Sequence, residues 1–273
     1  MELSETDREA LATAMRRLEA PGFAGRLANR IGRPAEMAAR ALPKPASGLV
    51  ARAAEAAMAR ALDIALFSLR DARFGGGRVV HSALASASGA VGGAFGLAAL
   101  AIELPVSTAI MLRAIAAIAR KHGEDLTDPA VGLACLEVFG LGHSGPAAAE
   151  VESGYFAARA LFAEGLAQAA NVVVNKGSLH GGSALALRAL TPLVNRFGAV
   201  VTQKLAVQAV AVMGAVGGAG INLAFVEHFQ ELARGHFTVR RLERIYGAEA
   251  VRAEYDQLRV ADQQARRQIA AMP

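Results

Sequence analysis

Apolar positions recur at helical spacing along most of the chain, and this pattern predicts helices nearly throughout. Between residues 47 and 72, for example, Val50, Ala54 and Ala57 fall near one face of a helix. The strict alternation of apolar and polar residues that is typical of strands is scarce, and short β-branched runs such as 172–174 lie inside longer helical patterns. We therefore predict an all-α fold, a multi-helix bundle.

Prolines, glycines and capping residues mark the predicted helix ends. Ser4 and Asp128 have the side chains and the sequence context of N-caps. We expect Pro105 to open a helix, because proline is tolerated at the first helical position. Near the C-terminus we expect Gly235 and Gly247 to separate shorter helices.

Three segments follow from these breaks. Residues 1–44 are expected to form an N-terminal amphipathic helical arm that is mobile relative to the body, because closely spaced prolines interrupt the pattern at 43–45. Residues 45–247 are expected to form the helical core. Residues 248–273 are expected to form a C-terminal polar helix that faces solvent, since charged residues of both signs occur on most of its sides.

Two glycine-rich apolar segments stand out, at 83–102 and 205–226. Both contain the motif GAVGGA, which is consistent with an internal pseudo-repeat. Glycines four residues apart remove side chains from one helix face and allow a second backbone to approach closely. Each segment is long enough to span a bilayer, which takes about 20 residues, but alanine, glycine and serine make both only weakly hydrophobic. We favour buried core, or a reversibly inserted hairpin, over permanent membrane spans.

The charge distribution changes this picture only slightly. The net charge of +5 comes mainly from both ends of the chain, and a weakly basic exterior suits either anionic lipid or plain solvation. With 5% aromatic residues and no recognised binding motif, we predict no nucleic-acid partner.

The single cysteine, Cys135, lies in an apolar helical run and fits a packed thiol in a reducing compartment. The N-terminus does not have the pattern of a signal peptide, so we predict a cytoplasmic protein, peripheral to or reversibly inserted in the inner membrane.

Several polar residues in apolar surroundings are candidates for chemistry. Glu103 and Glu227 end the two apolar segments, where a carboxylate is costly unless it is paired. They either are paired, through an ion pair with Arg113 or a neighbouring helix or through a cap interaction at Pro105, or converge with His228 and with His236 or His143. In the second case they would bind a metal or act as acid and base. Arg113 either anchors a carboxylate or phosphate headgroup or extends to the surface. The chain contains no HExxH motif, P-loop or nucleophile elbow, so we predict no metal and no cofactor.

Beside these features, the chain resembles the EcsC family over most of residues 45–247. The resemblance rests on AIELPVST at 101–108, MLR at 111–113, GEDL at 123–126, CLEVF at 135–139, residues 214–222, EHFQELARGHF at 227–237 and VRRLE at 239–243. It implies a bacterial, helical protein that associates with the cytoplasmic side of the membrane and is accessory to transport or lipid handling. No catalytic residues are implied by the resemblance.

The sequence therefore predicts a membrane-associated accessory protein that binds membrane lipid, an acyl chain or another apolar ligand and is linked to an ABC-type exporter. One alternative is a hydrolase that acts on an apolar substrate through Glu103, Glu227 and His228. Another is a scaffold for a membrane transporter. The candidate ligand-binding residues are Glu103, Arg113, Asn222, Glu227, His228, Gly89, Gly93, Gly214 and Gly218.

Overall fold

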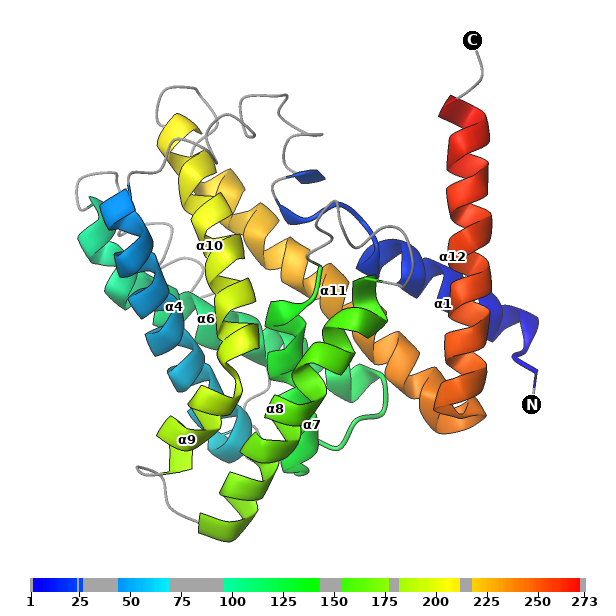
Figure 1. Ribbon diagram of the computed structural model, residues 1–273, viewed down its shortest axis with the longest axis horizontal. Coiled ribbons are helices and arrows are strands. Elements are labelled where there is room, and N and C mark those ends of the chain that lie inside the picture. Colours follow the sequence, from blue (N-terminus) through cyan, green and yellow to red (C-terminus); the bar gives the residue numbers. More distant parts are fainter. Residues whose placement is uncertain are drawn as a thin grey trace.

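The computed structural model describes residues 2–23, 25–26, 44–68, 96–142, 154–176, 182–211 and 218–270, and these ranges are helical with short connections (Figure 1). This confirms the all-α prediction. The elements are α1 (Glu5–Leu18), α4 (Lys44–Asp63), a π-helix (Ile64–Ser68), α6 (Gly96–Lys121), α7 (Pro129–Glu137), a 3₁₀ turn (Val138–Gly140), α8 (Gly154–Lys176), α9 (Gly182–Ala189), α10 (Thr191–Ala211), α11 (Gly218–Tyr246) and α12 (Ala248–Ala270).

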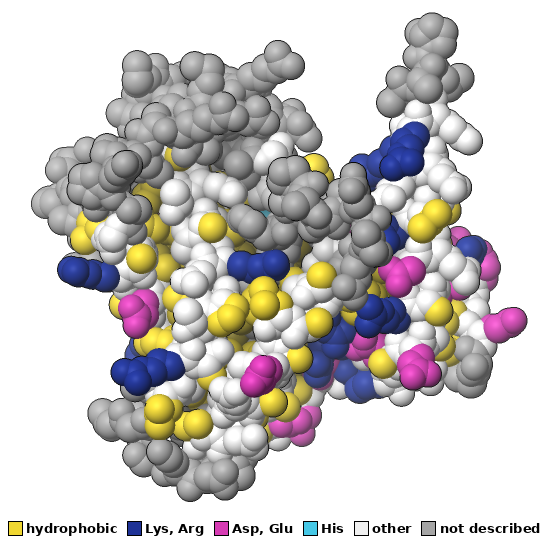
Figure 2. All heavy atoms as spheres, viewed as in Figure 1, with side chains coloured by type: hydrophobic (Ala, Val, Ile, Leu, Met, Phe, Trp, Pro, Cys, Tyr) yellow, Lys and Arg dark blue, Asp and Glu magenta, His cyan; other side chains and the backbone are white. Residues whose placement is uncertain are grey.

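Among the helices that the structure describes, the longest is α11. It packs on α1, α6, α10 and α12, and in Figure 1 it runs diagonally behind α10 towards the foot of α12. Helix α4 packs along α6 and α10 on the other side of the molecule. In Figure 2 charged side chains are more frequent towards α12 than over α4, α9 and α10, where apolar side chains reach the surface.

Local sequence signals position several helix ends as expected. The Ser4 Oγ accepts a hydrogen bond from the Asp7 backbone N–H at 3.2 Å, and an Asp128 Oδ1 accepts one from the Ala130 N–H at 2.8 Å. These bonds satisfy N–H groups that have no partner within the first turn of a helix. Gly247 has φ +88° between α11 and α12, a conformation that favours glycine, and so separates these helices as predicted.

Two predicted helix ends are wrong. Pro105 lies inside α6 rather than at its start, and Gly235 lies inside α11 rather than between two helices. In α6 the buried side chains of Leu104 and Leu112 lie on both sides of the proline, and burying each stabilises the continuous helix by roughly 1.5–3 kcal/mol, which offsets the local cost. A Cβ on Gly235 would lie 2.7 Å from Leu18 Cγ, so this glycine makes room for α1 rather than ending a helix.

Both ends of the chain pack on the body more closely than expected. Leu11, Ala14, Met15 and Leu18 of α1 are buried and belong to the same apolar cluster as α11. Residues 5–18 therefore do not form the mobile arm that we expected, because the apolar face of α1 packs on α11 and α12. Helix α12 likewise buries Val251 and Tyr255, although most of its outer face is exposed. The boundaries of the three predicted segments stay predictions.

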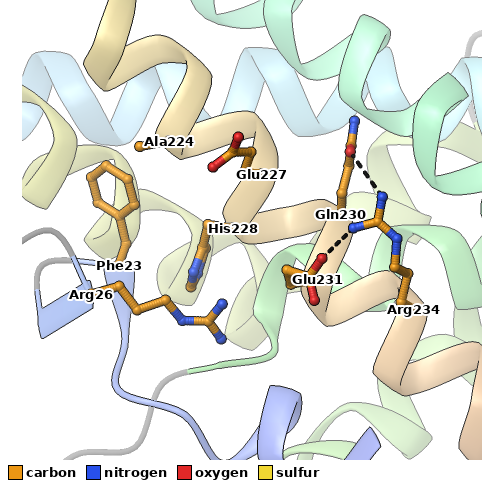
Figure 3. A pocket seen from close by; sticks show the side chains of 8 residues that line it. All are labelled: Phe23, Arg26, Ala224, Glu227, His228, Gln230, Glu231 and Arg234. Carbon is orange, nitrogen blue, oxygen red and sulfur yellow. Dashed lines mark hydrogen bonds and ion pairs between the residues drawn. The ribbon is translucent and has the colours of Figure 1, made fainter. Parts of the chain in front are cut away.

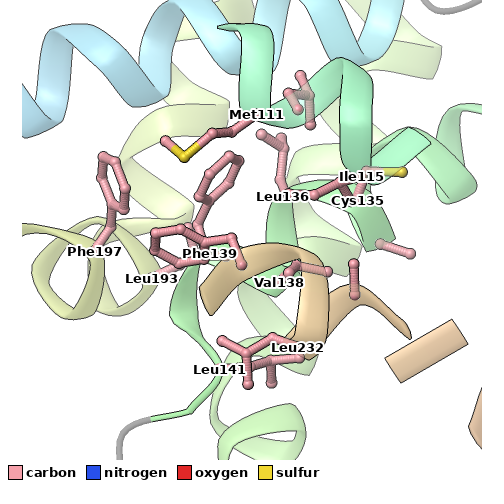
Figure 4. Packing of buried hydrophobic residues seen from close by; sticks show 14 of the residues in the cluster. Met111, Ile115, Cys135, Leu136, Val138, Phe139, Leu141, Leu193, Phe197 and Leu232 are labelled. Carbon is pink, nitrogen blue, oxygen red and sulfur yellow. The ribbon is translucent and has the colours of Figure 1, made fainter. Parts of the chain in front are cut away.

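The core centres on the end of α7 and the turn that follows it (Figure 4). Phe139 contacts Phe197 of α10 and Phe229 of α11, with ring centroids 5.2 and 5.1 Å apart. Cys135 is fully buried nearby, and burial raises the pKa of its thiol, so it is a packed residue as the sequence predicted. In the described ranges, no helix has the length and apolar character needed to cross a membrane.

Candidate functional site

A cleft of about 320 Å³ opens between α11 and the segment that follows α1 (Figure 3). Phe23 and Arg26 contribute from that segment, and the remaining lining residues come from α11. They are Ala224, Glu227, His228, Gln230, Glu231 and Arg234. Their spacing of three and four residues places the α11 side chains along one side of a helix. The cleft thus joins parts of the chain that are about 200 residues apart in the sequence.

Aromatic rings form the floor of the cleft. Phe23 and His228 are 1% and 2% exposed, and their ring centroids lie 5.8 Å apart in an edge-to-face arrangement. Phe23 also contacts Phe225 at 5.4 Å, and Phe225 contacts Phe229 at 5.1 Å. Phe229 in turn packs on Phe139, so ring contacts connect the floor to the centre of the core. This continuous packing holds the floor in place.

Charged side chains form the walls of the cleft. The Glu231 carboxylate pairs with Arg234 on the same helix and with the Nε of Arg17 on α1, the latter at 2.8 Å. Arg26 donates to the backbone carbonyls of Pro21 at 3.0 Å and of Arg17 at 2.8 Å, and these bonds hold the segment after α1 against the end of that helix. The walls therefore combine carboxylates and guanidinium groups at fixed positions.

The structure brings two of the predicted site residues into this cleft. Glu227 and His228 line it, whereas Glu103 is not a lining residue. Glu103 instead pairs with Lys204 of α10, and the Lys204 Nζ lies 3.5 Å from the Glu103 Oε1. An ion pair with a neighbouring helix was one of the alternatives that the sequence allowed for Glu103. Burial lowers the pKa of Lys204, and its Nζ lies 4.9 Å from the centre of the Phe225 ring.

The other predicted residues do not line the cleft. Arg113 lies partly buried on α6, and Gly218 is the first residue of α11. The Oδ1 of Asn222 is buried, and in the described part of the chain no donor forms a hydrogen bond with it. Gly89, Gly93 and Gly214 lie outside the described residues, so the predicted glycine-lined packing of the two apolar segments stays a prediction.

Sequence reasoning missed four of the polar residues of the cleft: Arg26, Gln230, Glu231 and Arg234. The signal for those on α11 was available, because residues 224, 227, 228, 230, 231 and 234 follow helical spacing with polar side chains at most positions. No such signal pointed to Arg26. Its contribution depends on how α1 docks on α11.

A second polar cluster lies in the interior between α7, α8 and α11. The Tyr155 hydroxyl and His236 Nδ1 form a hydrogen bond at 3.0 Å, and His236 Nε2 lies 3.7 Å from Glu137 Oε2. Burial raises the pKa of Glu137 to about 7, against the effect of the nearby Arg159 and Arg240, and burial lowers the pKa of His236 well below its usual value. All three residues are at most 5% exposed, so we interpret the cluster as structural rather than as a substrate site.

Within the ranges that the structure describes, no three histidine, cysteine, aspartate or glutamate side chains come together in a way that would hold a metal ion. The cleft can still bind by ion pairs and hydrogen bonds, because carboxylate, guanidinium, amide and imidazole groups all line it. A fold and a site of this kind define an α-helical protein with a charged surface cleft on its longest helix.

The chain belongs to the EcsC protein family, whose model matches residues 63–242. This match confirms the family that the sequence motifs indicated. No curated protein and no solved structure matches the chain. The match includes the part of α11 that lines the cleft, whereas Phe23 and Arg26 precede it. The cleft is therefore built from the family core together with an N-terminal segment outside the matched range.

Proposed function

We propose that this protein is a membrane-associated accessory protein that binds lipid, with the cleft on α11 as its ligand site. The cleft is the observation that carries the proposal. Its volume of about 320 Å³ is at the lower end of the range of roughly 300–1,000 Å³ in which proteins bind small molecules. Its firm aromatic floor and charged walls suit a compact polar ligand better than a long acyl chain.

The composition of the walls decides which part of a lipid would enter. Six of the eight lining side chains are polar or charged, and Phe23 and Ala224 are the apolar ones. Burying an acyl chain against charged groups would remove water from them without providing new partners, which is costly. We therefore propose that the headgroup occupies the cleft while the acyl chains stay in the bilayer.

An exposed apolar residue beside the cleft supports this orientation. Leu223 directly precedes the lining residue Ala224 on α11, and 55% of it is exposed. A single exposed leucine is ordinary on a protein surface. Next to a headgroup cleft, however, it would reach the apolar layer below the lipid headgroups, and insertion would gain about 25 cal/mol for each Å² that leaves water.

Liposome flotation tests the proposal with matched variants. The wild-type protein should float with the vesicles, and Leu223→Asp should reduce the floating fraction several-fold. Leu185→Asp is the control, because Leu185 is 43% exposed on α9 and does not line the cleft. A wild-type protein that stays entirely at the bottom of the gradient with every vesicle composition would refute lipid binding.

The arrangement favours binding over the hydrolase alternative. That alternative needs Glu103, Glu227 and His228 around one substrate, because catalytic partners act within hydrogen-bond reach or through one water. Glu103 instead pairs with Lys204, and only Glu227 and His228 line the cleft. The link to an ABC-type exporter and the transporter scaffold remain proposals, and co-purification with a detergent-solubilised transporter would test both.

A further inference from the structure

Building on the proposed lipid binding, we propose that the cleft on α11 selects a zwitterionic headgroup that carries a phosphate and a primary ammonium group. This names the class of ligand by its charges. Arg26 would hold the phosphate and Glu227 would hold the ammonium group. The inference depends on how charge is distributed over the walls.

The walls of the cleft carry both signs of charge in nearly equal number. Arg26 and Arg234 are positive, and Glu227 and Glu231 are negative. Glu231 is shared between Arg234 and Arg17, so its charge is already matched by guanidinium groups. The four charged side chains that line the cleft, two arginines and two glutamates, therefore have a formal net charge of zero. A ligand in the cleft meets guanidinium groups and carboxylates in equal number.

The charges are also separated in space. Figure 3 shows the Glu227 carboxylate near Ala224, with the His228 ring between it and the guanidinium of Arg26 in this view, while Arg234 lies beyond Glu231. Glu227 lies on α11, and Arg26 lies on the segment after α1. A ligand that extends across His228 could place opposite charges at its two ends.

A ligand with one sign of charge fits this arrangement less well. A simple anion near Arg26 or Arg234 would also lie close to the carboxylates of the same cleft, and like charges repel. A simple cation would have the same difficulty with the arginines. A zwitterion can direct phosphate oxygens to the guanidinium groups, which favour bidentate contacts, and its ammonium group to Glu227.

Calorimetric titration with water-soluble headgroups tests this selectivity without a membrane. The probes are glycerophosphoethanolamine, glycerophosphoglycerol and inorganic phosphate, which share the phosphate and differ in the ammonium group. We expect glycerophosphoethanolamine to bind the wild-type protein at least tenfold more tightly than the other two. Since these probes have no acyl chains, the result reports on the cleft alone.

Variants identify the residues responsible. Glu227→Gln keeps the size of the side chain and removes its charge, so the preference for glycerophosphoethanolamine should fall to about equal binding of the two glycerol phosphodiesters. Arg26→Lys should weaken both phosphodiesters, because lysine cannot form the same bidentate contact. Arg120→Gln, an exposed change on α6 outside the cleft, should leave all affinities unchanged. Thermal melts of each variant check that it is folded.

The outcomes separate this inference from the proposed function. Equal affinity for all three probes, or tighter binding of glycerophosphoglycerol, overturns the zwitterion inference, as does flotation with vesicles when no soluble headgroup binds. In the latter case lipid binding itself still stands. Selective binding of glycerophosphoethanolamine without flotation supports the cleft assignment and refutes the membrane association. If Glu227→Gln is unfolded, the selectivity of the wild-type protein still decides the question.

Discussion

Replacing Gly235 with alanine tests how tightly α1 docks on α11. A Cβ at position 235 would lie 2.7 Å from Leu18 Cγ and 3.1 Å from the Ala14 carbonyl oxygen. Leu18 is 2% exposed and Ala14 contributes a backbone atom, so neither can move away easily. Overpacking of this kind costs typically about 1–3 kcal/mol, while alanine gains about 1 kcal/mol in helix propensity over glycine. We expect a net loss of about 1 kcal/mol, and up to about 2 kcal/mol.

Gly198→Ala is the matched control. Gly198 is also inside a helix, α10, but the atom nearest to a Cβ at this position would be Ala54 Cβ at 3.6 Å, an ordinary contact. The propensity gain should then prevail and stabilise the protein by up to about 1 kcal/mol. The two substitutions are chemically identical and have opposite expected signs.

Thermal unfolding followed by circular dichroism measures both effects. At about 2–4 °C for each kcal/mol, Gly235→Ala should lower the Tm by a few degrees and Gly198→Ala should raise it. Adding Leu18→Ala removes the closest side chain, so in that background Gly235→Ala should cost less than in the wild-type protein. If Gly235→Ala raises the Tm as much as Gly198→Ala does, α1 does not pack on α11 as described.

The remaining predictions concern the buried titratable groups. Because burial raises the pKa of Glu137 to about 7 from 4.5, its contribution to stability is present at low pH and is lost as pH rises from about 4.5 through about 7. Glu137→Gln should therefore have almost no effect at pH 4 and should stabilise the protein at pH 8 by up to about 3 kcal/mol, measured by urea unfolding; a constant difference across this range would contradict the assignment. The difference between variant and wild type is the quantity to compare, since His236, with its lowered pKa, contributes stability that is gained as pH rises. Cys135 should resist thiol reagents in the native protein and react fully in denaturant, because it is completely buried and burial raises its pKa; rapid native labelling would show that the core around Phe139 opens.

The sequence by itself determined the helical class and many local features. Helical spacing of apolar residues predicted an all-α fold, and Ser4, Asp128 and Gly247 identified helix ends, because capping depends on groups only a few residues apart. Glu227 and His228 were candidates from sequence because polar residues at the end of an apolar run are costly. Both line the cleft, although their role in binding stays a prediction.

Only the tertiary structure decided which segments meet. Pro105 and Gly235 signal helix ends locally, but burial along α6 and the close approach of α1 to α11 outweigh these preferences. Glu103 pairs with Lys204, which is roughly 100 residues away in the sequence. Arg26 lines the same cleft as residues of α11 that are roughly 200 residues away. Helical periodicity tells which face of a helix is apolar, but not which other helix covers it. Packing of the whole chain chooses those partners, and so it also decides where charged side chains gather into a cleft.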